Sequence, residues 1–271
     1  MFEPAAFLNQ LKRCAVMGIV NVTGDSFSEG ASSAPESAVR RAVALFEKGT
    51  DILDLGAEST RPGSKPVEPA EECSRLIPVL KTLKELIPQV VISVDTRHGH
   101  TASEALKYGA DIINDVSMGA DAELLKTTAD HNATLILCHS RGTPQNMNDP
   151  QYTSYPEGVC RTVQDELESA CQKAAAYGIP REHIWLDPGV GFAKTAEQCR
   201  ALIAGAASFT RRHPWLWGVS KKSFMGGPVD SRGAETLKIE KELIANGASV
   251  IRTHDADALC RAMGWKQEGK N

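Results

Sequence analysis

The sequence lacks any long apolar run, and aromatic residues make up only 6% of it. A helix that crosses a membrane needs about 20 consecutive, mostly apolar residues. No run in this chain approaches that length, so we expect no membrane partner. The opening residues Met1 to Pro4 do not begin a cationic stretch followed by an apolar one, so we expect no secretory signal either.

An excess of positive charge is also missing. The formal net charge is −4, whereas proteins that bind nucleic acid in general are usually basic. The pair Lys221-Lys222 is a local exception that could contact a small anion. With 42% hydrophobic and 24% charged residues, the composition is that of an ordinary globular protein. We therefore expect small-molecule partners and no nucleic acid.

Paired metal-binding or disulfide motifs are absent. The seven cysteines are odd in number and scattered, and no C-x-x-C occurs. This usage predicts reduced thiols in a cytoplasmic protein. The seven histidines form neither H-x-E nor H-E-x-x-H, so no zinc site is expected. Any metal would be a hard cation with oxygen ligands, carried by a substrate phosphate, with Asn21 as a possible contact.

What the sequence does contain is a repeated order of short, β-branched segments and amphipathic segments. The segments expected to form strands are 15–22, 51–56, 90–97, 111–116, 133–138, 183–187, 215–219 and 249–252. The segments expected to form helices are 35–48, 69–86, 99–108, 120–131, 157–177, 196–211, 233–246 and 256–265. Alternation of this kind indicates a parallel sheet with right-handed crossovers.

Eight such units in 271 residues fit an α/β fold of the (β/α)8 TIM-barrel type. We expect one domain over residues 1–271, with a short lead-in at 1–14 and a polar tail at 266–271. A doubly wound open sheet is the competing fold. It would need a G-x-G-x-x-G turn after the first strand, and the sequence from Asn21 to Gly24 does not provide one.

The expected strand at 90–97 is apolar and ends on Asp95, and a buried carboxylate is costly unless something pairs with it. The other expected strands also end on polar residues, namely Asn21, Glu58 to Arg61, Asn114-Asp115, His139, Asp187, Lys221-Lys222 and His254. Taken singly, each of these could be structural. In a barrel, however, all strand ends face one mouth, where active sites are built. The sequence therefore predicts one site at this mouth.

Part of this set suits a flat, guanidine-like heterocycle. Asp95, Asp187 and Asn114 can accept paired hydrogen bonds from the donor edge of such a ring. Gly189 and Gly191 would allow the backbone to approach a ligand closely, as would Gly63.

The cationic part of the set suits a phosphate group. Arg61, Arg252 and His254 are charged or can become so, and Asn21 would add a neutral contact. The predicted site therefore has a heterocycle-binding part and a phosphate-binding part.

Several segments resemble the signatures of one family, the dihydropteroate synthases. The segments that carry the resemblance, in the family's order, are Met17-Gly18-Ile19-Val20-Asn21-Val22-Thr23-Gly24-Asp25-Ser26-Phe27-Ser28, Gly56-Ala57-Glu58-Ser59-Thr60-Arg61-Pro62-Gly63, Ser93-Val94-Asp95-Thr96, Ile113-Asn114-Asp115-Val116, Leu186-Asp187-Pro188-Gly189-Val190-Gly191-Phe192, Ser220-Lys221-Lys222-Ser223-Phe224 and Ile251-Arg252-Thr253-His254-Asp255. The resemblance extends from about residue 15 to 264. It implies a (β/α)8 barrel.

The resemblance also implies a reaction of folate biosynthesis. The family joins 6-hydroxymethyl-7,8-dihydropterin diphosphate to para-aminobenzoate and releases diphosphate. It implies pterin contacts at Asp95, Asn114, Asp187 and Lys222, and diphosphate contacts at Asn21, Arg252 and His254, with Mg²⁺ near Asn21. It implies a para-aminobenzoate pocket formed by Phe27, Thr60, Arg61, Pro62, Phe192, Lys222 and Ser223. Asp95, Lys222 and Arg252 are the implied catalytic residues. No covalent nucleophile is required.

Some positions depart from the family's pattern. Gly24 stands where Pro is usual, Ser140 where Met often follows the His, Lys221 where Arg is usual and Ala57 where Gly is common. The helix expected around 235–243 is far more charged than the small, apolar helix that helps form the family's dimer. A homodimer is therefore possible but doubtful.

Alternative functions stay open at this point. The departures at Gly24, Ser140 and Lys221 would also fit a non-catalytic or altered-substrate pterin-binding relative. A pterin-dependent methyltransferase would share the Asp and Asn positions but leaves the segment from Ser59 to Pro62 unexplained. A Schiff-base aldolase would use Lys222. Sulfonamides mimic para-aminobenzoate in this family, and we expect sensitivity because the two-residue insertion of mobile resistance enzymes is absent.

Overall fold

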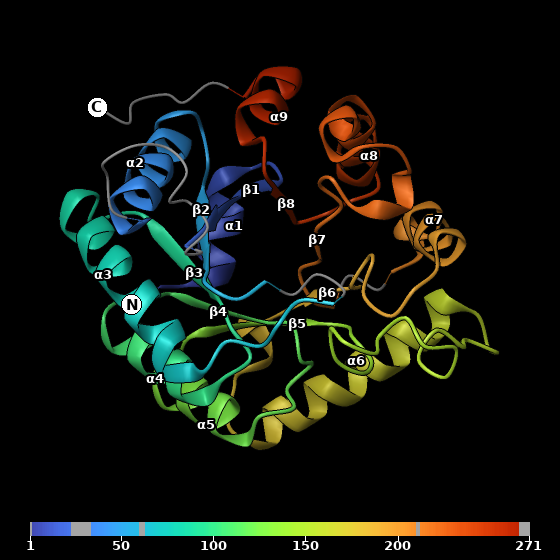
Figure 1. Cartoon of the computed structure of the whole chain (residues 1–271), viewed down its shortest axis with the longest axis horizontal. Coiled ribbons are helices and arrows are strands. Elements are labelled where there is room, and N and C mark those ends of the chain that lie inside the picture. The colour runs from blue at the N-terminus through green and yellow to red at the C-terminus, as the bar shows by residue number, and fades with distance from the viewer. Residues whose placement is uncertain (1, 23–33, 60–62, 210–211, 266–271) are drawn as a thin grey trace.

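The computed structural model describes residues 2–22, 34–59, 63–209 and 212–265. Five residues singled out in the sequence analysis lie outside these ranges. They are Gly24, which departs from the family's pattern, and the predicted pocket residues Phe27, Thr60, Arg61 and Pro62. Strands and helices alternate along the described chain, as the sequence predicts, and helices surround the strands (Figure 1).

Eight parallel strands form one sheet in the order β6-β5-β4-β3-β2-β1-β8-β7. Their bounds are β1 Ala15–Asn21, β2 Ile52–Gly56, β3 Val91–Asp95, β4 Ile112–Asp115, β5 Thr134–Cys138, β6 Ile184–Asp187, β7 Leu216–Trp217 and β8 Val250–Thr253. A bridge between Leu186 and Trp215 joins the two outer strands. The sheet is thus a nearly closed barrel, which confirms the predicted fold.

Helices connect the strands on the outside of the barrel. Their bounds are α2 Ala34–Glu47, α3 Pro69–Leu86, α4 Gly99–Lys107, α5 Ala122–Asp130, α6 Val159–Ala176, α7 Ala196–Ala204, α8 Gly233–Ala245 and α9 Ala256–Met263. Short 3₁₀ helices occur at η2 Arg181–His183, η3 Ala206–Ser208, η4 Ser223–Met225 and η5 Val229–Arg232. The predicted elements match within a few residues, apart from the helix at 196–211, which ends at Ala204, and β7, which is shorter than 215–219.

A further helix, α1 (Pro4–Leu11), lies in the lead-in, where the sequence analysis identified no element. Its side chains Phe7, Leu8 and Leu11 pack, together with Phe2, against the inner residues of the barrel. Those inner residues are Ala15, Met17, Ile52, Ile112, Ile136, Trp185, Leu216 and Val250. Burial of these apolar side chains closes the amino-terminal end of the barrel, and a site can therefore open only at the other end.

The register of the strands aligns several predicted site residues. Asn21 of β1 pairs with Gly56 of β2, Gly56 with Asp95 of β3, and Asp95 with Asn114 of β4. These four residues form one row across the carboxyl ends of neighbouring strands. Parallel pairing therefore brings residues up to 93 positions apart in sequence to one level of the mouth.

All charged side chains of helix α8 except Glu240 lie on its exposed side. Thr236, Ile239, Glu240 and Leu243 are buried, whereas the remaining charged side chains of the helix are exposed. The possible but doubtful homodimer stays a prediction. Within the described ranges, every helix is too short or too polar to cross a membrane.

Candidate active site

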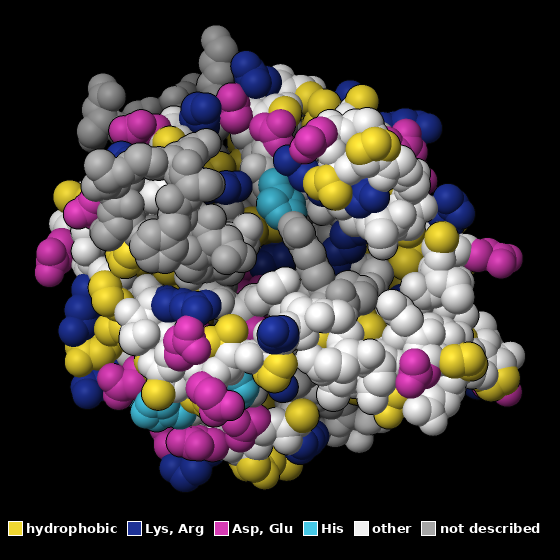
Figure 2. Space-filling model, in the orientation of Figure 1, with side chains coloured by type: hydrophobic (Ala, Val, Ile, Leu, Met, Phe, Trp, Pro, Cys, Tyr) yellow, Lys and Arg dark blue, Asp and Glu magenta, His cyan; other side chains and the backbone are white. Residues whose placement is uncertain are grey.

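A cavity of about 410 Å³ opens at the carboxyl ends of the strands. Seven of the residues predicted to contact a substrate or Mg²⁺ line it, namely Asn21, Asp95, Phe192, Lys222, Ser223, Arg252 and His254. The predicted pterin contacts Asn114 and Asp187 are not among its lining residues. Figure 2 shows Lys, Arg and His side chains around the hollow on this face. Four residues predicted for the para-aminobenzoate pocket, Phe27, Thr60, Arg61 and Pro62, lie outside the described residues.

Arg252 connects the floor of the cavity to two carboxylates. Its Nε–H donates a hydrogen bond to Oδ2 of Asp54 at 2.6 Å, and its Nη2–H donates one to Oδ2 of Asp95, also at 2.6 Å. Both carboxylates are buried. Charge-assisted bonds of this length are strong and directional, so Arg252 holds Asp95 in one position.

Asp54 is a site residue that the sequence analysis missed. It is fully buried in the middle of β2 and accepts hydrogen bonds from Ser93 Oγ at 2.6 Å and from Asn114 Nδ2 at 3.3 Å, besides that from Arg252. One carboxylate thereby positions the predicted pterin contact Asn114 and the cation Arg252. The sequence could have indicated this role, because Asp54 is a charged residue in the middle of an otherwise apolar strand segment.

The pKa values of Asp95 and Arg252 result from two opposing effects, the burial of both charges and the attraction between opposite charges. Burial raises the pKa of Asp95 to about 7, because desolvation outweighs the attraction of Arg252. Burial alone would lower the pKa of Arg252, but Asp54 and Asp95 raise it above its ordinary value. Arg252 therefore stays charged, while Asp95 titrates near neutral pH.

Asp187 ends β6 and Lys222 follows β7, and the charge of Arg252 acts on both. Asp187 Oδ1 accepts a hydrogen bond from the amide of Gly189 at 2.7 Å, and Lys222 Nζ donates one to the carbonyl of Val190. Lys222 Nζ also lies 4.4 Å from the centroid of the Phe192 ring. Burial raises the pKa of Asp187 and lowers that of Lys222, and the attraction between the two charges opposes both shifts.

His139 does not line the cavity, although it follows β5 as predicted. Its Nε2 lies 2.9 Å from Oε2 of Glu166 on α6, and its Nδ1 lies 2.9 Å from Nζ of Lys194. Burial, reinforced by Lys194, lowers the pKa of His139 to about 4, so the ring is neutral. These contacts indicate the tautomer in which Nδ1 accepts from Lys194 and Nε2–H donates to Glu166.

Lys194 is a second residue that the sequence analysis missed. Besides its bond to His139, its Nζ donates to the carbonyls of Gly189 at 3.1 Å and Phe192 at 3.0 Å. Burial lowers the pKa of Lys194 to about 7. Lys194 therefore stabilises the loop after β6, which begins after Asp187 and carries Phe192.

Gly189 has a structural role that the sequence analysis did not identify. Its φ is +66°, and a Cβ there would lie 1.8 Å from the carbonyl oxygen of His139. The glycine is therefore required by contact between two loops of the chain itself.

Of the residues predicted for a phosphate group, Arg252 and His254 of the β8 segment and Asn21 of β1 line the cavity, and Arg61 lies outside the described residues. The backbone N–H of His254 donates to Ser220 Oγ at 3.1 Å, and its Nδ1 lies 3.0 Å from the same oxygen. Asn21 is exposed at the end of β1. Arg232 also lines the cavity and was missed; its Nη1 donates to the carbonyl of Lys221 at 2.8 Å.

Two of the departures have a local explanation. Ser140 Oγ donates to the carbonyl of Val116 at 2.6 Å, which fixes the loop after β5 to the loop after β4. Lys221 adopts a φ of +58°, and its amide lies 3.2 Å from Thr236 Oγ1 of α8. Lys221 therefore lines the cavity on a backbone held by α8.

Comparison with known proteins agrees with this geometry. A family model described as pterin binding enzyme matches residues 17–254. The chain is 38% identical to a dihydropteroate synthase of Synechocystis over 92% of this chain and 88% of the relative. A solved dihydropteroate synthase of Xanthomonas albilineans with 4-aminobenzoic acid superimposes with a TM-score of 0.86 at 32% identity, covering 94% of this chain and 92% of the other. A second structure from that organism, in complex with 7,8-dihydropteroate, gives a TM-score of 0.84 at 31% identity, covering 94% and 92% of the two chains. The chain belongs to the pterin-binding enzyme family.

Proposed function

We propose that this chain is a dihydropteroate synthase, a transferase of folate biosynthesis. It condenses 6-hydroxymethyl-7,8-dihydropterin diphosphate with para-aminobenzoate and releases diphosphate. The observation that carries the proposal is the buried carboxylate of Asp95 at the cavity floor, held at 2.6 Å by Arg252. Its relatives of similar length are named as dihydropteroate synthases, and solved neighbours hold 4-aminobenzoic acid or 7,8-dihydropteroate.

The pterin is recognised through the donor edge of its ring. Asp95 and Asp187 accept hydrogen bonds from ring N–H and amino groups, and Asn114 adds an amide that can accept and donate. Lys222 Nζ donates to a ring acceptor. These groups come from β3, β4, β6 and the loop after β7, and Asp95 and Lys222 line the cavity itself.

The reaction begins with the departure of diphosphate. The bond between the pterin methylene carbon and the diphosphate oxygen breaks, and positive charge develops on the methylene and the ring. The fixed carboxylate of Asp95 stabilises that charge in a site with little water. Arg252 and His254 bind the departing diphosphate. The nitrogen of para-aminobenzoate then bonds to the carbon and loses a proton, so the main task of the protein is to position the reactants.

Mg²⁺ fits this site as a hard cation held mainly by diphosphate oxygens. Asn21 is exposed at the end of β1, lines the cavity, and offers an amide oxygen, which is a suitable ligand. When bound, Mg²⁺ supplies charge neutralisation for the departing diphosphate. Asn21 would hold it from the protein side.

Para-aminobenzoate occupies the outer part of the cavity. The Phe192 ring, fixed beside Lys222, provides a flat apolar surface for the benzene ring. Ser223 and Lys222 stand at the start of η4 and supply polar contacts to the carboxylate. Phe27, Thr60, Arg61 and Pro62 are expected to complete this pocket.

We further propose that the chain works in the cytoplasm. All seven cysteines are free thiols, as expected for a reducing compartment.

The direct test supplies both substrates and Mg²⁺ to the purified chain. We expect dihydropteroate and diphosphate to form in equal amounts, as measured by chromatography and a coupled diphosphate assay. An Asp95→Asn variant serves as the matched control. If neither product forms at high enzyme concentration, the proposal is wrong. Pterin binding by calorimetry without turnover would instead indicate a non-catalytic relative.

A further inference from the structure

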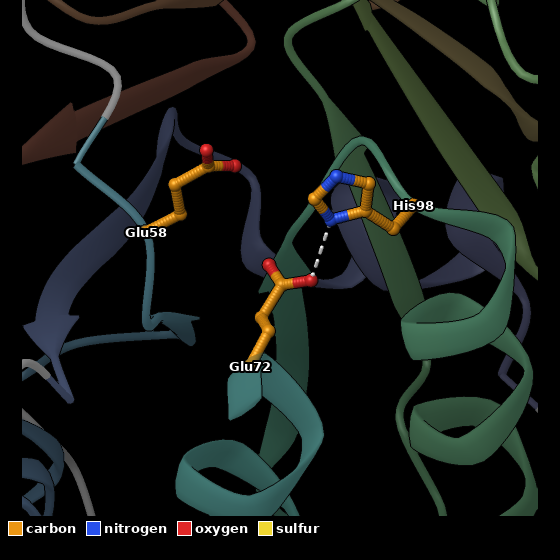
Figure 3. Close-up of side chains that lie close together, drawn as sticks. All are labelled: Glu58, Glu72 and His98. Carbon is orange, nitrogen blue, oxygen red and sulfur yellow. Dashed lines mark hydrogen bonds and ion pairs between the residues drawn. The ribbon is translucent and has the colours of Figure 1, made fainter. Parts of the chain in front are cut away.

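Three side chains, one of which lines the cavity, converge on one small space. Glu58 follows β2, Glu72 belongs to α3, and His98 precedes α4. One potential ligand atom from each lies within 4.8 Å of the other two. Figure 3 shows the three side chains turned toward one another. None of them was predicted as a ligand from the sequence.

The two oxygens of Glu72 have very different surroundings, although the residue is fully buried. Oε2 accepts from Thr96 Oγ1 at 2.9 Å and from Thr101 Oγ1 at 2.5 Å, and it lies 3.0 Å from His98 Nδ1. Oε1 has no hydrogen-bond partner within the described part of the chain. Figure 3 shows this oxygen on the side that faces Glu58. A buried charged oxygen without a partner is costly and calls for a ligand.

The charges around this space do not balance. Four carboxylates act on one another here against two guanidiniums, namely Asp54, Glu58, Glu72 and Asp95 against Arg97 and Arg252. When all four carboxylates are ionised, they exceed the two guanidiniums by two negative charges, which one divalent cation would neutralise. Burial makes such a surplus expensive.

We propose that Glu58, Glu72 and His98 form a binding site for a divalent first-row transition-metal ion. Glu72 Oε1, one carboxylate oxygen of Glu58 and His98 Nδ1 are the ligands. An imidazole with two carboxylates is a donor set that such ions favour. On binding, the hydrogen on Nδ1 moves to Nε2, which leaves the ring neutral.

The ion replaces one existing contact, the hydrogen bond between His98 Nδ1 and Glu72 Oε2, and keeps those of Glu58. Arg97 donates to Glu58 Oε2 through Nε at 3.1 Å and to Glu58 Oε1 through Nη2 at 3.0 Å, and the N–H of Val67 also donates to Oε1 at 3.3 Å. Glu58 Oε2 therefore keeps a lone pair for the ion. The side chain of His98 is 20% exposed and that of Glu58 5%, which provides a path for entry. Because Glu58 also lines the cavity, the ion would fix one wall of the active site.

This site differs from the one proposed for Mg²⁺ at Asn21. The Mg²⁺ site depends on diphosphate oxygens, whereas this site has three protein ligands, one of them nitrogen. Magnesium prefers oxygen ligands throughout. The transition-metal ion should therefore bind without any substrate, and its binding does not depend on the proposed activity.

The test measures Mn²⁺ binding to the chelator-treated, substrate-free protein by electron paramagnetic resonance. Mn²⁺ is the probe because the free cysteines would also take up zinc. We expect one Mn²⁺ per chain, unaffected by a tenfold excess of Mg²⁺. Glu72→Gln and His98→Gln should each weaken Mn²⁺ binding by about tenfold or more. Mutation of a residue that only hydrogen-bonds to a metal ligand already lowers metal affinity by about that factor.

Matched controls come from the neighbouring residues. Glu71→Gln changes an exposed side chain beside Glu72 on α3, and His100→Gln changes an exposed side chain on α4, two residues after His98. Asn21→Ala removes the proposed Mg²⁺ contact. All three should bind Mn²⁺ as the wild type does. Mn²⁺ should also raise the melting temperature of the wild type but not that of the partly exposed His98→Gln. Absence of stoichiometric Mn²⁺ in the wild type, or unchanged affinity in Glu72→Gln and His98→Gln, would overturn the proposal.

Discussion

Arg252 and Asp54 are joined by a 2.6 Å hydrogen bond between Nε and Oδ2 beneath the floor of the cavity. This bond connects β8 to β2 and leaves Nη2 of the same guanidinium to hold Asp95. Asp54 therefore sets the position of two groups that face the substrate without lining the cavity itself. It is a positioning residue, and its removal should affect turnover as well as stability.

Asp54→Asn should lower turnover by about 10²-fold, the scale of losing one oriented electrostatic group. It should also reduce the free energy of unfolding by about 3 kcal/mol or more, because Arg252 loses a buried partner. Asp51→Asn is the matched control. Asp51 lies three residues before Asp54 and also pairs with an arginine, Arg13, but at the closed end of the barrel. Urea denaturation should show a loss for both variants and kinetics a loss for Asp54→Asn alone. Normal turnover in a folded Asp54→Asn would refute the positioning role.

Asp95→Asn should lower turnover by about 10²-fold or more if the carboxylate steadies the developing cation. Because burial raises the pKa of Asp95 to about 7, wild-type kcat/KM should increase with pH through that value. The stabilising effect of this raised pKa is complete below the ordinary value of 3.8 and is lost as pH rises through about 7. The pH profile and urea denaturation from pH 4 to 8 check both, and an unchanged rate would exclude the assigned role.

Arg252→Lys should weaken binding of the pterin diphosphate more than binding of para-aminobenzoate. A lysine can carry the charge but cannot reach Asp54 and Asp95 with a planar fork. Calorimetry with each substrate separately measures the two effects. Equal weakening of both substrates would argue against a diphosphate contact.

Lys194→Met should change the pH dependence of stability. The folded chain holds fewer protons on Lys194 than the unfolded chain between pH 7 and 10.5, because burial lowers the pKa of this amine to about 7. Its contribution to the free energy of unfolding should therefore rise with pH across that window. Denaturation at pH 6.5 and 9 should show this rise in the wild type relative to Lys194→Met. A difference that does not vary with pH would contradict the buried amine.

Gly189→Ala should abolish activity and destabilise the fold, because the new Cβ would lie 1.8 Å from the carbonyl of His139. Gly158→Ala is the control, since Gly158 has a φ of +86° with no atom within 4 Å of an added Cβ. The control should lose only about 1–2 kcal/mol, the cost of a left-handed alanine. Melting temperatures and turnover rates of the two variants distinguish the steric clash with His139 from the strain of a left-handed backbone. Similar losses in both would mean that the loops can move apart.

Local patterns were enough to predict most of the fold. Helix α3 begins and ends where its apolar spacing predicts, because Pro69 suits a first turn and the buried Leu76, Leu80 and Leu83 share one face. Helix α1 was missed although Phe7, Leu8 and Leu11 have helical spacing, since a short terminal segment is stabilised mainly by what it packs against. The sequence signalled the helix but not the barrel end that it covers.

The sequence by itself determined the barrel and the convergence of Asn21, Asp95 and Arg252 at one mouth, because parallel strands in a closed sheet must end on one side. Only the tertiary structure decided the partners of those residues. Asp54 supports Arg252, Lys194 supports the loop after β6, and the Glu72 oxygen that has no partner among the described residues faces Glu58 (Figure 3). Contacts of this kind depend on which residues of different strands and helices come within hydrogen-bond distance, and hydrophobic periodicity along one segment carries no information about that distance.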